Sequence, residues 1–370
     1  MVIMIGNKAC DPYIINLVYG EYVEPKRIGT IPWLGLNREI QRSGEKAGLV
    51  FFRHSRFRPR GTVAQRMLVM PYYIAQSADL PPADVDLLSI FYNASTKTDL
   101  KRIQSAKFEY EITQDPEQLE FFYHQMYAPM ILSRHKNAAQ VVRWEYFKEV
   151  YGKMELLLIL KAGRPVGGSI ISQTGDCLNK HIFGLLNADH ELRKEGIGAS
   201  NYWFSIVEAH RRGCATINYQ CSRPFLKNGI IAYKKKWGGR IIMDRREREL
   251  WLLPDLNRPS VSRFLEENPF ICEQDGLLVS LIFLGSWISL NDEELSIYFK
   301  NIHIQGDHLS TFVILLNDEW VARKEMIQNI LRTLPQPSRI LDLSNTSLTE
   351  LQNLIRENGY PLHARQADLP

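Results

Sequence analysis

The order of predicted secondary-structure elements in residues 106–253 constrains the fold of this chain most. Apolar residues that alternate or form short runs predict strands, and apolar residues spaced three or four apart predict helices. By these criteria the predicted strands are 108–112, 154–160, 165–172, 181–186, 215–219 and 240–243, and the predicted helices are 115–128, 138–151, 198–212 and 225–237. This order indicates an α/β or α+β domain with a mixed sheet, because hairpin-connected strands come first and strand–helix–strand units follow.

The stretch Pro254–Pro259 predicts a domain boundary, since two prolines follow a strand-like segment and the composition then changes. Beyond it, strands and helices alternate three times, which predicts a small parallel sheet covered by helices. The predicted strands are 277–287, 311–316 and 339–343, and the predicted helices are 292–301, 319–334 and 347–358. We therefore expect an α/β domain at 254–370, without a phosphate-binding glycine loop.

The first 105 residues are less regular. Strands are expected at 47–52 and 66–70, and helices at 83–92 and 98–105. The expected organisation is thus an N-terminal lobe (1–105), a central domain (106–253) and a C-terminal domain (254–370).

Composition and charge exclude several classes of protein. Hydrophobic residues make up 45% and charged residues 23% of the chain, as in ordinary globular proteins, so bulk disorder is excluded. The longest apolar run, 277–290, is shorter than the roughly 20 residues that a membrane-spanning helix needs. Five scattered cysteines without a CxxC motif, and the lack of a secretory signal at the N-terminus, favour a reducing cytoplasm without disulfides or a metal site.

The charge is distributed unevenly along the chain. Residues 1–253 carry 36 Lys and Arg against 25 Asp and Glu, whereas residues 254–370 carry 9 against 16. A basic body suits an anionic ligand, and the acidic C-terminal domain is a candidate docking surface for a protein partner. Two domains with differently charged solvated faces would give the same asymmetry.

The motif that carries chemistry is the loop Arg193–Ala199, between the predicted strand 181–186 and the predicted helix 198–212. Amide groups in the first turn of a helix, together with its positive dipole end, form an anion site. Gly196 and Gly198 lack a Cβ and would let a pyrophosphate approach the backbone. Arg193 and Lys194 add positive charge. The loop therefore predicts a phosphate-binding turn.

Arg193, Gly196 and Gly198 fill the pattern Arg/Gln-x-x-Gly-x-Gly/Ala, so residues 106–250 resemble the GCN5-related N-acetyltransferase (GNAT) superfamily. A narrower likeness joins Gly213, Asn218–Phe225, Asn228–Gly229 and Tyr233–Gly238 to its FemAB-like branch, in which a degraded first copy of the fold often precedes a complete one. Residues 1–105 would be that degraded copy. The tRNA-associated helical hairpin of FemAB enzymes has no counterpart here, and the 254–370 domain is not part of their usual pattern.

The resemblance implies an acyltransferase that uses acetyl-CoA or another acyl-CoA and no metal. The acyl-CoA would lie between the splayed strands 181–186 and 215–219. The residues implied to bind it are Gly184, Leu185, Arg193, Lys194, Gly196, Gly198 and Ala199. Tyr233 is a candidate acid for the leaving thiolate, while a FemAB-style alignment instead makes Lys234 the functional cation.

A base must also take the proton of the acceptor amine. His181, at the start of a splayed strand, is one candidate. Glu109 is another and shares a strand face with Glu111, because strand residues alternate between faces. The candidates for acceptor binding leave the end of the second splayed strand, namely Asn218, Tyr219, Ser222 and Arg223.

Three functions follow as hypotheses. The first is N-acyl transfer from acyl-CoA to an amine of a sugar, amino acid or peptide-like metabolite. The second keeps the fold but takes the acyl or aminoacyl group from tRNA or an acyl carrier protein, which the basic body also suits. The third is an inactive GNAT scaffold with the C-terminal domain as its docking piece.

Overall fold

The computed structural model describes residues 1–6, 11–21, 23–53, 59–135, 141–242, 249–256, 258–274, 277–306 and 309–343. The chain forms two compact units. Unit 1 comprises residues 1–74, 222–232 and 241–370, and unit 2 comprises residues 75–221 and 233–240. These units do not follow the predicted boundaries at 105 and 253, because residues 75–105 belong to the same compact unit as the central domain.

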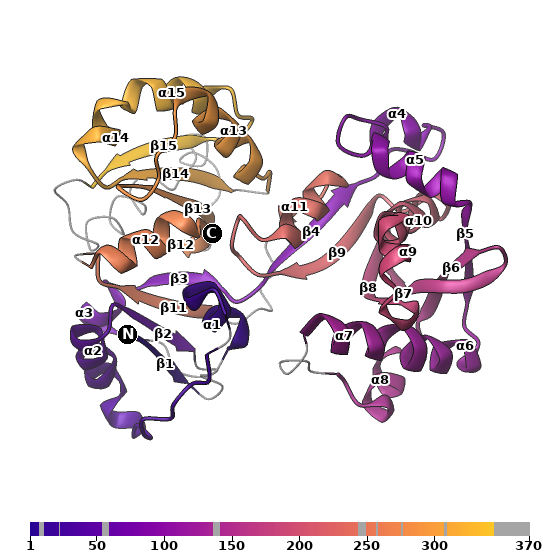
Figure 1. Ribbon diagram of the computed structural model, residues 1–370, viewed down its shortest axis with the longest axis horizontal. Helices are drawn as coiled ribbons and strands as arrows, with labels where there is room; N and C mark the ends of the chain where they lie inside the picture. The colour runs from indigo at the N-terminus through magenta and orange to yellow at the C-terminus, as the bar shows by residue number, and fades with distance from the viewer. Residues whose placement is uncertain are drawn as a thin grey trace, which may run out of the picture. The chain divides into compact units, whose positions relative to one another are not determined.

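The sheet of unit 2 has seven strands in the order β10–β4–β9–β8–β7–β6–β5 (Figure 1). The strands are β4 (Ile74–Asp79), β5 (Phe108–Thr113), β6 (Glu155–Lys161), β7 (Arg164–Thr174), β8 (Cys177–Leu185), β9 (Thr216–Ser222) and β10 (Arg240–Ile242). The strands β5 to β8 pair antiparallel in succession, and β8 then pairs parallel with β9. The sheet is therefore mixed, as the sequence predicted.

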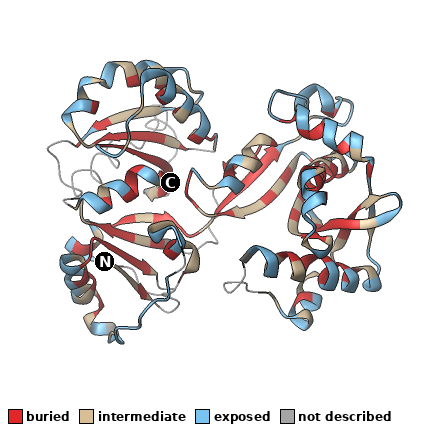
Figure 2. Cartoon of the chain, in the orientation of Figure 1, coloured by how far each residue is buried: buried red, intermediate tan, exposed pale blue. Residues whose placement is uncertain are grey.

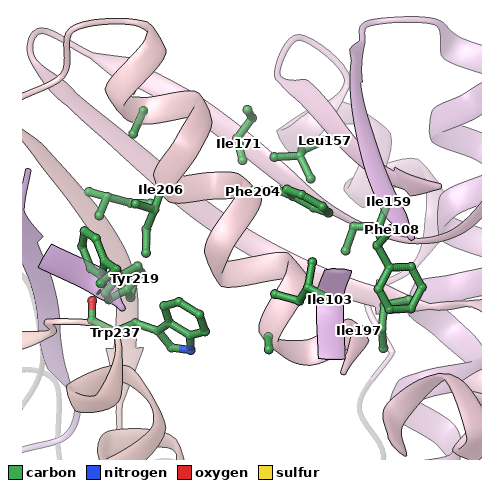
Figure 3. Close-up of a cluster of buried hydrophobic side chains, with 14 of the residues drawn as sticks. Ile103, Phe108, Leu157, Ile159, Ile171, Ile197, Phe204, Ile206, Tyr219 and Trp237 are labelled. Atoms are coloured by element: carbon green, nitrogen blue, oxygen red, sulfur yellow. Dashed lines mark hydrogen bonds between the residues drawn. The ribbon is translucent and has the colours of Figure 1, made fainter. Parts of the chain in front are cut away.

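Helices cover this sheet. They are α4 (Leu87–Phe91), α5 (Lys97–Ala106), α6 (Pro116–Phe121), the π-helix η2 (Phe122–Tyr127), α7 (Ala128–His135), α8 (Trp144–Tyr151), the 3₁₀ turn η4 (Leu186–Ala188), α9 (His190–Lys194), α10 (Ile197–Arg211) and α11 (Gly229–Lys236). One apolar core joins α10, α5 and α4 to the sheet, and Figure 3 shows Phe204 and Ile206 of α10 among its members. A second core packs η2 and α8 against β6 and β7.

Ion pairs fix the end of α10. The buried Glu208 carboxylate binds Arg211 and Arg212, with N–O distances of 2.7 and 2.6 Å. Arg212 also binds Glu155 of β6 at 2.6 Å. Burial raises the pKa of Glu208, but hydrogen bonds from Arg211 and Arg212 favour the charged carboxylate and lower the pKa below its ordinary value. These pairs anchor the C-terminal end of α10 to β6.

Unit 1 contains two four-stranded sheets, ordered β1–β2–β11–β3 and β12–β13–β14–β15. The strands are β1 (Val2–Gly6), β2 (Leu49–Arg53), β3 (Leu68–Pro71), β11 (Glu249–Pro254), β12 (Phe270–Gln274), β13 (Leu277–Leu284), β14 (Ser310–Leu315) and β15 (Ser338–Asp342). The helices are α1 (Pro12–Tyr19), η1 (Trp33–Gly35), α2 (Leu36–Lys46), α3 (Gly61–Ala64), α12 (Pro259–Glu267), α13 (Asp292–Ile302), α14 (Asp318–Ala322) and α15 (Lys324–Arg332). Figure 2 shows that the strands of both sheets are mostly buried.

The C-terminal part of unit 1 confirms the predicted parallel sheet, because β13, β14 and β15 pair parallel in register. The strand β12, which pairs antiparallel at the edge, was not predicted. The predicted helix 319–334 is divided at Arg323 into α14 and α15. The predicted helix 347–358 lies outside the described residues.

Three further predictions need correction. The predicted helix 115–128 is an α-helix only to Phe121, after which the π-helix η2 follows. The predicted helix 225–237 starts later, at Gly229, since the side chain of Asn228 accepts a hydrogen bond from the amide of Ile230. The predicted strand 181–186 starts earlier, at Cys177.

Candidate functional site

The strands β8 and β9 pair over only three residues. Cys177, Leu178 and Asn179 of β8 pair with Thr216, Ile217 and Asn218 of β9. Beyond these pairs β8 continues to Leu185 and β9 to Ser222, and the two strands separate (Figure 1). Beyond Asn179 the edge of β8 that faces β9 has no strand partner among the described residues, so its main chain can offer hydrogen-bonding groups to a ligand. We call this region, from Lys180 to Leu185 and from Tyr219 to Cys221, the splay.

The helix α10 begins near the open end of β8, after η4 and α9. Its N-cap, Gly196, has φ +100°, a conformation that L side chains rarely adopt. A Cβ at Gly196 would also lie 3.2 Å from the Cβ of Arg102 on α5. Gly196 is therefore required by the backbone itself, and not only by an approaching pyrophosphate as the sequence argument assumed.

Gly198 differs from Gly196. It lies in the first turn of α10 with an ordinary helical φ, and a Cβ built on it meets no atom within 4 Å. The space beside its backbone is thus open. The chain shows no packing or conformational reason for glycine here, whereas a phosphate bound to the first-turn amides would need that space.

Arg193 and Lys194 end the short helix α9, and both side chains are exposed. Lys194 binds Glu191 at 2.8 Å, and Glu195 binds Lys161 of β6 at 2.6 Å. Ala199 is buried in the core beneath α10. Of the predicted pyrophosphate-binding residues, the structure thus brings Arg193, Lys194 and Gly198 to one exposed turn.

Lys180 is the first residue of β8 in the splay, and only 6% of it is exposed. Its Nζ lies 4.6 Å from the ring centroid of Tyr202 on α10. Burial, together with the charge of the nearby Lys234, lowers its pKa from 10.5 to about 7. At neutral pH the amine of Lys180 is therefore partly deprotonated, as a general acid or base requires.

Lys234 of α11 is also buried, with 3% exposed. Its Nζ donates hydrogen bonds to the main-chain carbonyls of Gln220, at 2.7 Å, and Cys221, at 3.0 Å. These carbonyls belong to the splayed part of β9. Burial lowers the pKa of Lys234 to about 7. Lys234 thus holds the strand β9 at the splay, in a conformation in which Gln220 adopts φ +60°.

Tyrosine rings fill the space around these lysines. The ring of Tyr202 lies 5.1 Å from that of Tyr219 and 5.2 Å from that of Tyr233. Tyr219 donates a hydrogen bond from its hydroxyl to the main-chain carbonyl of Trp237 at 2.7 Å, and Figure 3 shows these two residues together. The splay therefore ends in an aromatic wall.

Tyr233, the predicted acid, is half-buried and interacts with Asp99 of α5. Burial is the main cause that raises its pKa above 10.0, and the charge of Asp99 adds to it. Asp99 also binds Lys236 at 2.6 Å. A raised pKa makes the Tyr233 hydroxyl a weaker acid than an ordinary tyrosine.

Gly184 contacts the π-helix on the other face of the sheet. A Cβ at Gly184 would lie 2.7 Å from Phe122, 2.9 Å from Met126 and 2.9 Å from the amide of Tyr127. Leu185 is buried and pairs with Gly167 of β7. The glycine thus lets η2 approach the splayed strand, and π-helical turns often occur at functional sites.

His181 follows Lys180 on β8 and therefore lies on the opposite face. Its Nε2 is 2.8 Å from Ser172 Oγ, and its ring lies 6.1 Å from that of Tyr151. Burial lowers the pKa of His181, and the charge of Lys180 lowers it further. The imidazole is therefore neutral at pH 7 and remains a candidate base.

The structure does not bring every predicted residue to the splay. Glu109 and Glu111 lie exposed on β5, the edge strand, and β6 and β7 separate them from β8. Asn218 lies in the last paired position and binds Asn179 at 3.2 Å. Ser222 and Arg223 belong to unit 1.

In unit 1, Arg223 binds Asp11 at 3.0 Å. Its guanidinium lies 4.0, 4.7 and 5.1 Å from the ring centroids of Tyr72, Tyr73 and Tyr13, respectively. Tyr72 also donates a hydrogen bond to Asp11 at 2.6 Å. Contacts within unit 1 thus account for the position of Arg223.

Lys180 was missed by the sequence analysis. The signal was available, since Lys180 follows Leu178 by two residues, so in an alternating strand the lysine occupies the same face as the buried Leu178. The predicted strand began at His181, which removed Lys180 from consideration.

Within the described ranges, no helix is long and apolar enough to cross a bilayer. The same residues contain no group of three or more His, Cys, Asp or Glu side chains arranged to hold a metal ion.

No protein-family model matches the chain, and no curated protein matches it. Solved structures are similar at low identity. FemX is 12% identical over 60% of this chain and 75% of its own, with a TM-score of 0.36. L-PGS from Bacillus licheniformis is 12% identical over 60% and 73%, with a TM-score of 0.36. A GCN5-related N-acetyltransferase from Sphaerobacter thermophilus is 14% identical over 62% and 70%, with a TM-score of 0.33.

Proposed function

We propose that unit 2 is an acyltransferase that moves an acyl group from acyl-CoA to an amine. The observation that carries this proposal is the combination of the splay with the open first turn of α10. The splay offers main-chain groups between two strands, and Gly198 leaves space at a helix N-terminus. An extended pantetheine with a pyrophosphate at one end has the shape and charge that this arrangement suits.

In this proposal the amides of the first turn of α10 hold the pyrophosphate, and Arg193 and Lys194 contribute charge. The pantetheine lies along the splay and points its thioester toward the closed end, where Lys180 and Tyr219 lie. Main-chain amides of β8 in the splay stabilise the oxyanion of the tetrahedral intermediate.

The pKa values decide between the candidate acids and bases. A free thiol has a pKa of about 8.5, so the half-buried Tyr233, with a raised pKa, is poorly matched to protonate a thiolate. Lys234, the other candidate from the sequence, has a pKa of about 7 and is better matched. We propose that His181, neutral at pH 7, takes the proton of the amine from the opposite face of the sheet.

The experiment is calorimetric titration of the protein with acetyl-CoA and with desulfo-CoA. We expect saturable binding of both ligands, which Arg193→Ala weakens by about tenfold because a charge-assisted contact to phosphate is lost. Lys148→Ala is the control for the loss of a positive charge, since Lys148 is exposed on α8, which packs in the core of η2 and not in that of α10. It should bind as the unchanged protein does.

Absence of binding by acetyl-CoA, desulfo-CoA and longer acyl-CoAs would overturn the proposal. The hypothesis of a donor carried by tRNA or an acyl carrier protein would then be favoured. The association of such a carrier with the protein would depend strongly on salt.

A further inference from the structure

We propose that Lys180 binds a carboxylate of the substrate at the closed end of the splay. The acyl donor is then an acyl-CoA whose chain ends in a carboxylate. This inference rests on the proposed function, and it assigns to that site a class of substrate and a residue that recognises it.

The position of Lys180 supports this role. It is the first residue of β8 beyond the last strand pair, Asn179 with Asn218. Five residue steps of about 3.3 Å separate it from Leu185 at the other end of the splay, a length of roughly 17 Å. A donor held at the first turn of α10 and extended along the splay therefore carries its acyl end toward Lys180.

The surroundings of Lys180 lack a negative charge. Tyr202 faces it from α10, Lys234 approaches from α11, and His181 is its neighbour on β8. Tyr219 of β9, Tyr233 of α11 and Arg134 of α7 also surround the ring of Tyr202, and the Asp99 carboxylate interacts with Tyr233. Among the described residues, no ion pair joins Lys180 to an Asp or Glu.

A buried cation is costly unless a partner compensates it. Tyr202 supplies only the face of its ring, and Lys234 adds repulsion. A substrate carboxylate would supply the missing charge and would bring the amine of Lys180 back to its protonated form. An acyl chain without a carboxylate would leave Lys180 uncompensated.

Three CoA esters test this selectivity. Binding of acetyl-CoA tests whether the protein has an acyl-CoA site at all. Succinyl-CoA and butyryl-CoA both carry four-carbon acyl chains, and only that of succinyl-CoA ends in a carboxylate. We expect calorimetry to show that the protein binds succinyl-CoA at least about tenfold more tightly than butyryl-CoA, as one ion pair in a low-dielectric site provides. Lys180→Met should abolish this preference and leave butyryl-CoA binding within about twofold.

Two variants serve as controls. Lys180→Arg keeps the charge and should keep the preference for succinyl-CoA. Lys153→Met removes an exposed lysine of the same unit and should change nothing. If Lys180→Met does not fold, Lys180→Gln replaces it in the same titrations.

A second arm distinguishes the source of the carboxylate. With desulfo-CoA bound, L-alanine and L-alaninamide are compared as ligands by thermal shift. If the protein shows no preference for succinyl-CoA but prefers L-alanine, and Lys180→Met removes that preference, Lys180 recognises a carboxylate on the acceptor instead.

If neither preference exists, or if Lys180→Met leaves both intact, the inference is wrong while acetyl-CoA binding still supports the proposed function. If no CoA ester binds, the proposed function fails first and the inference falls with it.

Discussion

The largely buried Arg223 of unit 1 and the buried Lys180 of unit 2 both lie among tyrosine rings but differ in how their charge is compensated. Arg223 of unit 1 has the Asp11 carboxylate at 3.0 Å in addition to its three tyrosines. Lys180 of unit 2 has the ring of Tyr202 and the repulsion of Lys234. The Asp11 carboxylate compensates the charge of Arg223, whereas no carboxylate of the described residues pairs with Lys180.

The difference separates structural residues from candidate functional ones. A buried charge with its counter-ion and hydrogen bonds is explained by folding alone. A buried charge that the chain leaves uncompensated costs stability, and such costs concentrate at functional sites. The two glycines at the start of α10 differ in the same way. The backbone conformation explains why position 196 is glycine, but it does not explain Gly198, which is therefore a candidate functional residue.

The largest predicted effect comes from breaking the compensated pair. Asp11→Asn keeps an N-cap side chain for α1 but removes the negative charge opposite Arg223. We expect unfolding free energy to fall by roughly 3 kcal/mol, because Arg223 would remain nearly buried without a counter-ion. Denaturant titration measures this loss.

The matched control is Asp86→Asn, which changes the exposed N-cap of α4 and should alter stability by less than about 0.5 kcal/mol. An Asp11→Asn protein as stable as this control would show that Arg223 does not depend on its carboxylate.

Lys180→Met should raise the unfolding free energy at neutral pH, whereas Asp11→Asn lowers it. The pKa of Lys180 is about 7 in the folded protein and about 10.5 in the unfolded chain. Between these values the unfolded chain binds more protons, so the unfolding free energy rises with pH. The variant should therefore be more stable than the unchanged protein at pH 7, and the difference should shrink by about 1.4 kcal/mol per pH unit as the pH rises toward 10.5.

Thermal or denaturant unfolding of both proteins across this pH range measures the effect. A Lys180→Met protein that is destabilised at every pH would indicate that Lys180 packs as a structural residue, which would weaken its contrast with Arg223.

Much of the fold could be predicted because local patterns were strong. Apolar runs with turn residues between them gave β5 to β9 and the parallel strands β13 to β15. Edge strands such as β12 and β1 were missed because their short sequences carry weak periodicity. The sequence could not show that β4 joins β9, since Ser77 and Ile217 are 140 residues apart and meet only through tertiary structure.

The site was predictable in part. The loop at Arg193 was found because glycine spacing and charge are visible in sequence. The pairing of Lys180 with Tyr202, and the contact of Tyr233 with Asp99, depend on helices that pack from distant parts of the chain. Glu109 was selected for its alternation, but strand order placed it at the far edge of the sheet.

The third prediction concerns Gly196. Gly196→Ala forces an L residue into φ +100° and brings its Cβ within 3.2 Å of Arg102. We expect a loss of about 1–2 kcal/mol in unfolding free energy. Chemical denaturation without ligand measures it, and an unchanged stability would mean that the turn relaxes to an ordinary conformation.

Gly198→Ala is expected to change stability least while it weakens the binding of desulfo-CoA. The new Cβ projects into open space, and alanine favours a helical conformation over glycine, so stability should stay equal or rise by up to about 1 kcal/mol. The same Cβ occupies the space that a pyrophosphate needs, so desulfo-CoA binding should weaken at least about tenfold. Stability and binding thus move in opposite directions, which a structural role for Gly198 cannot produce. A variant that binds desulfo-CoA normally would show that the open turn of α10 is not the phosphate site.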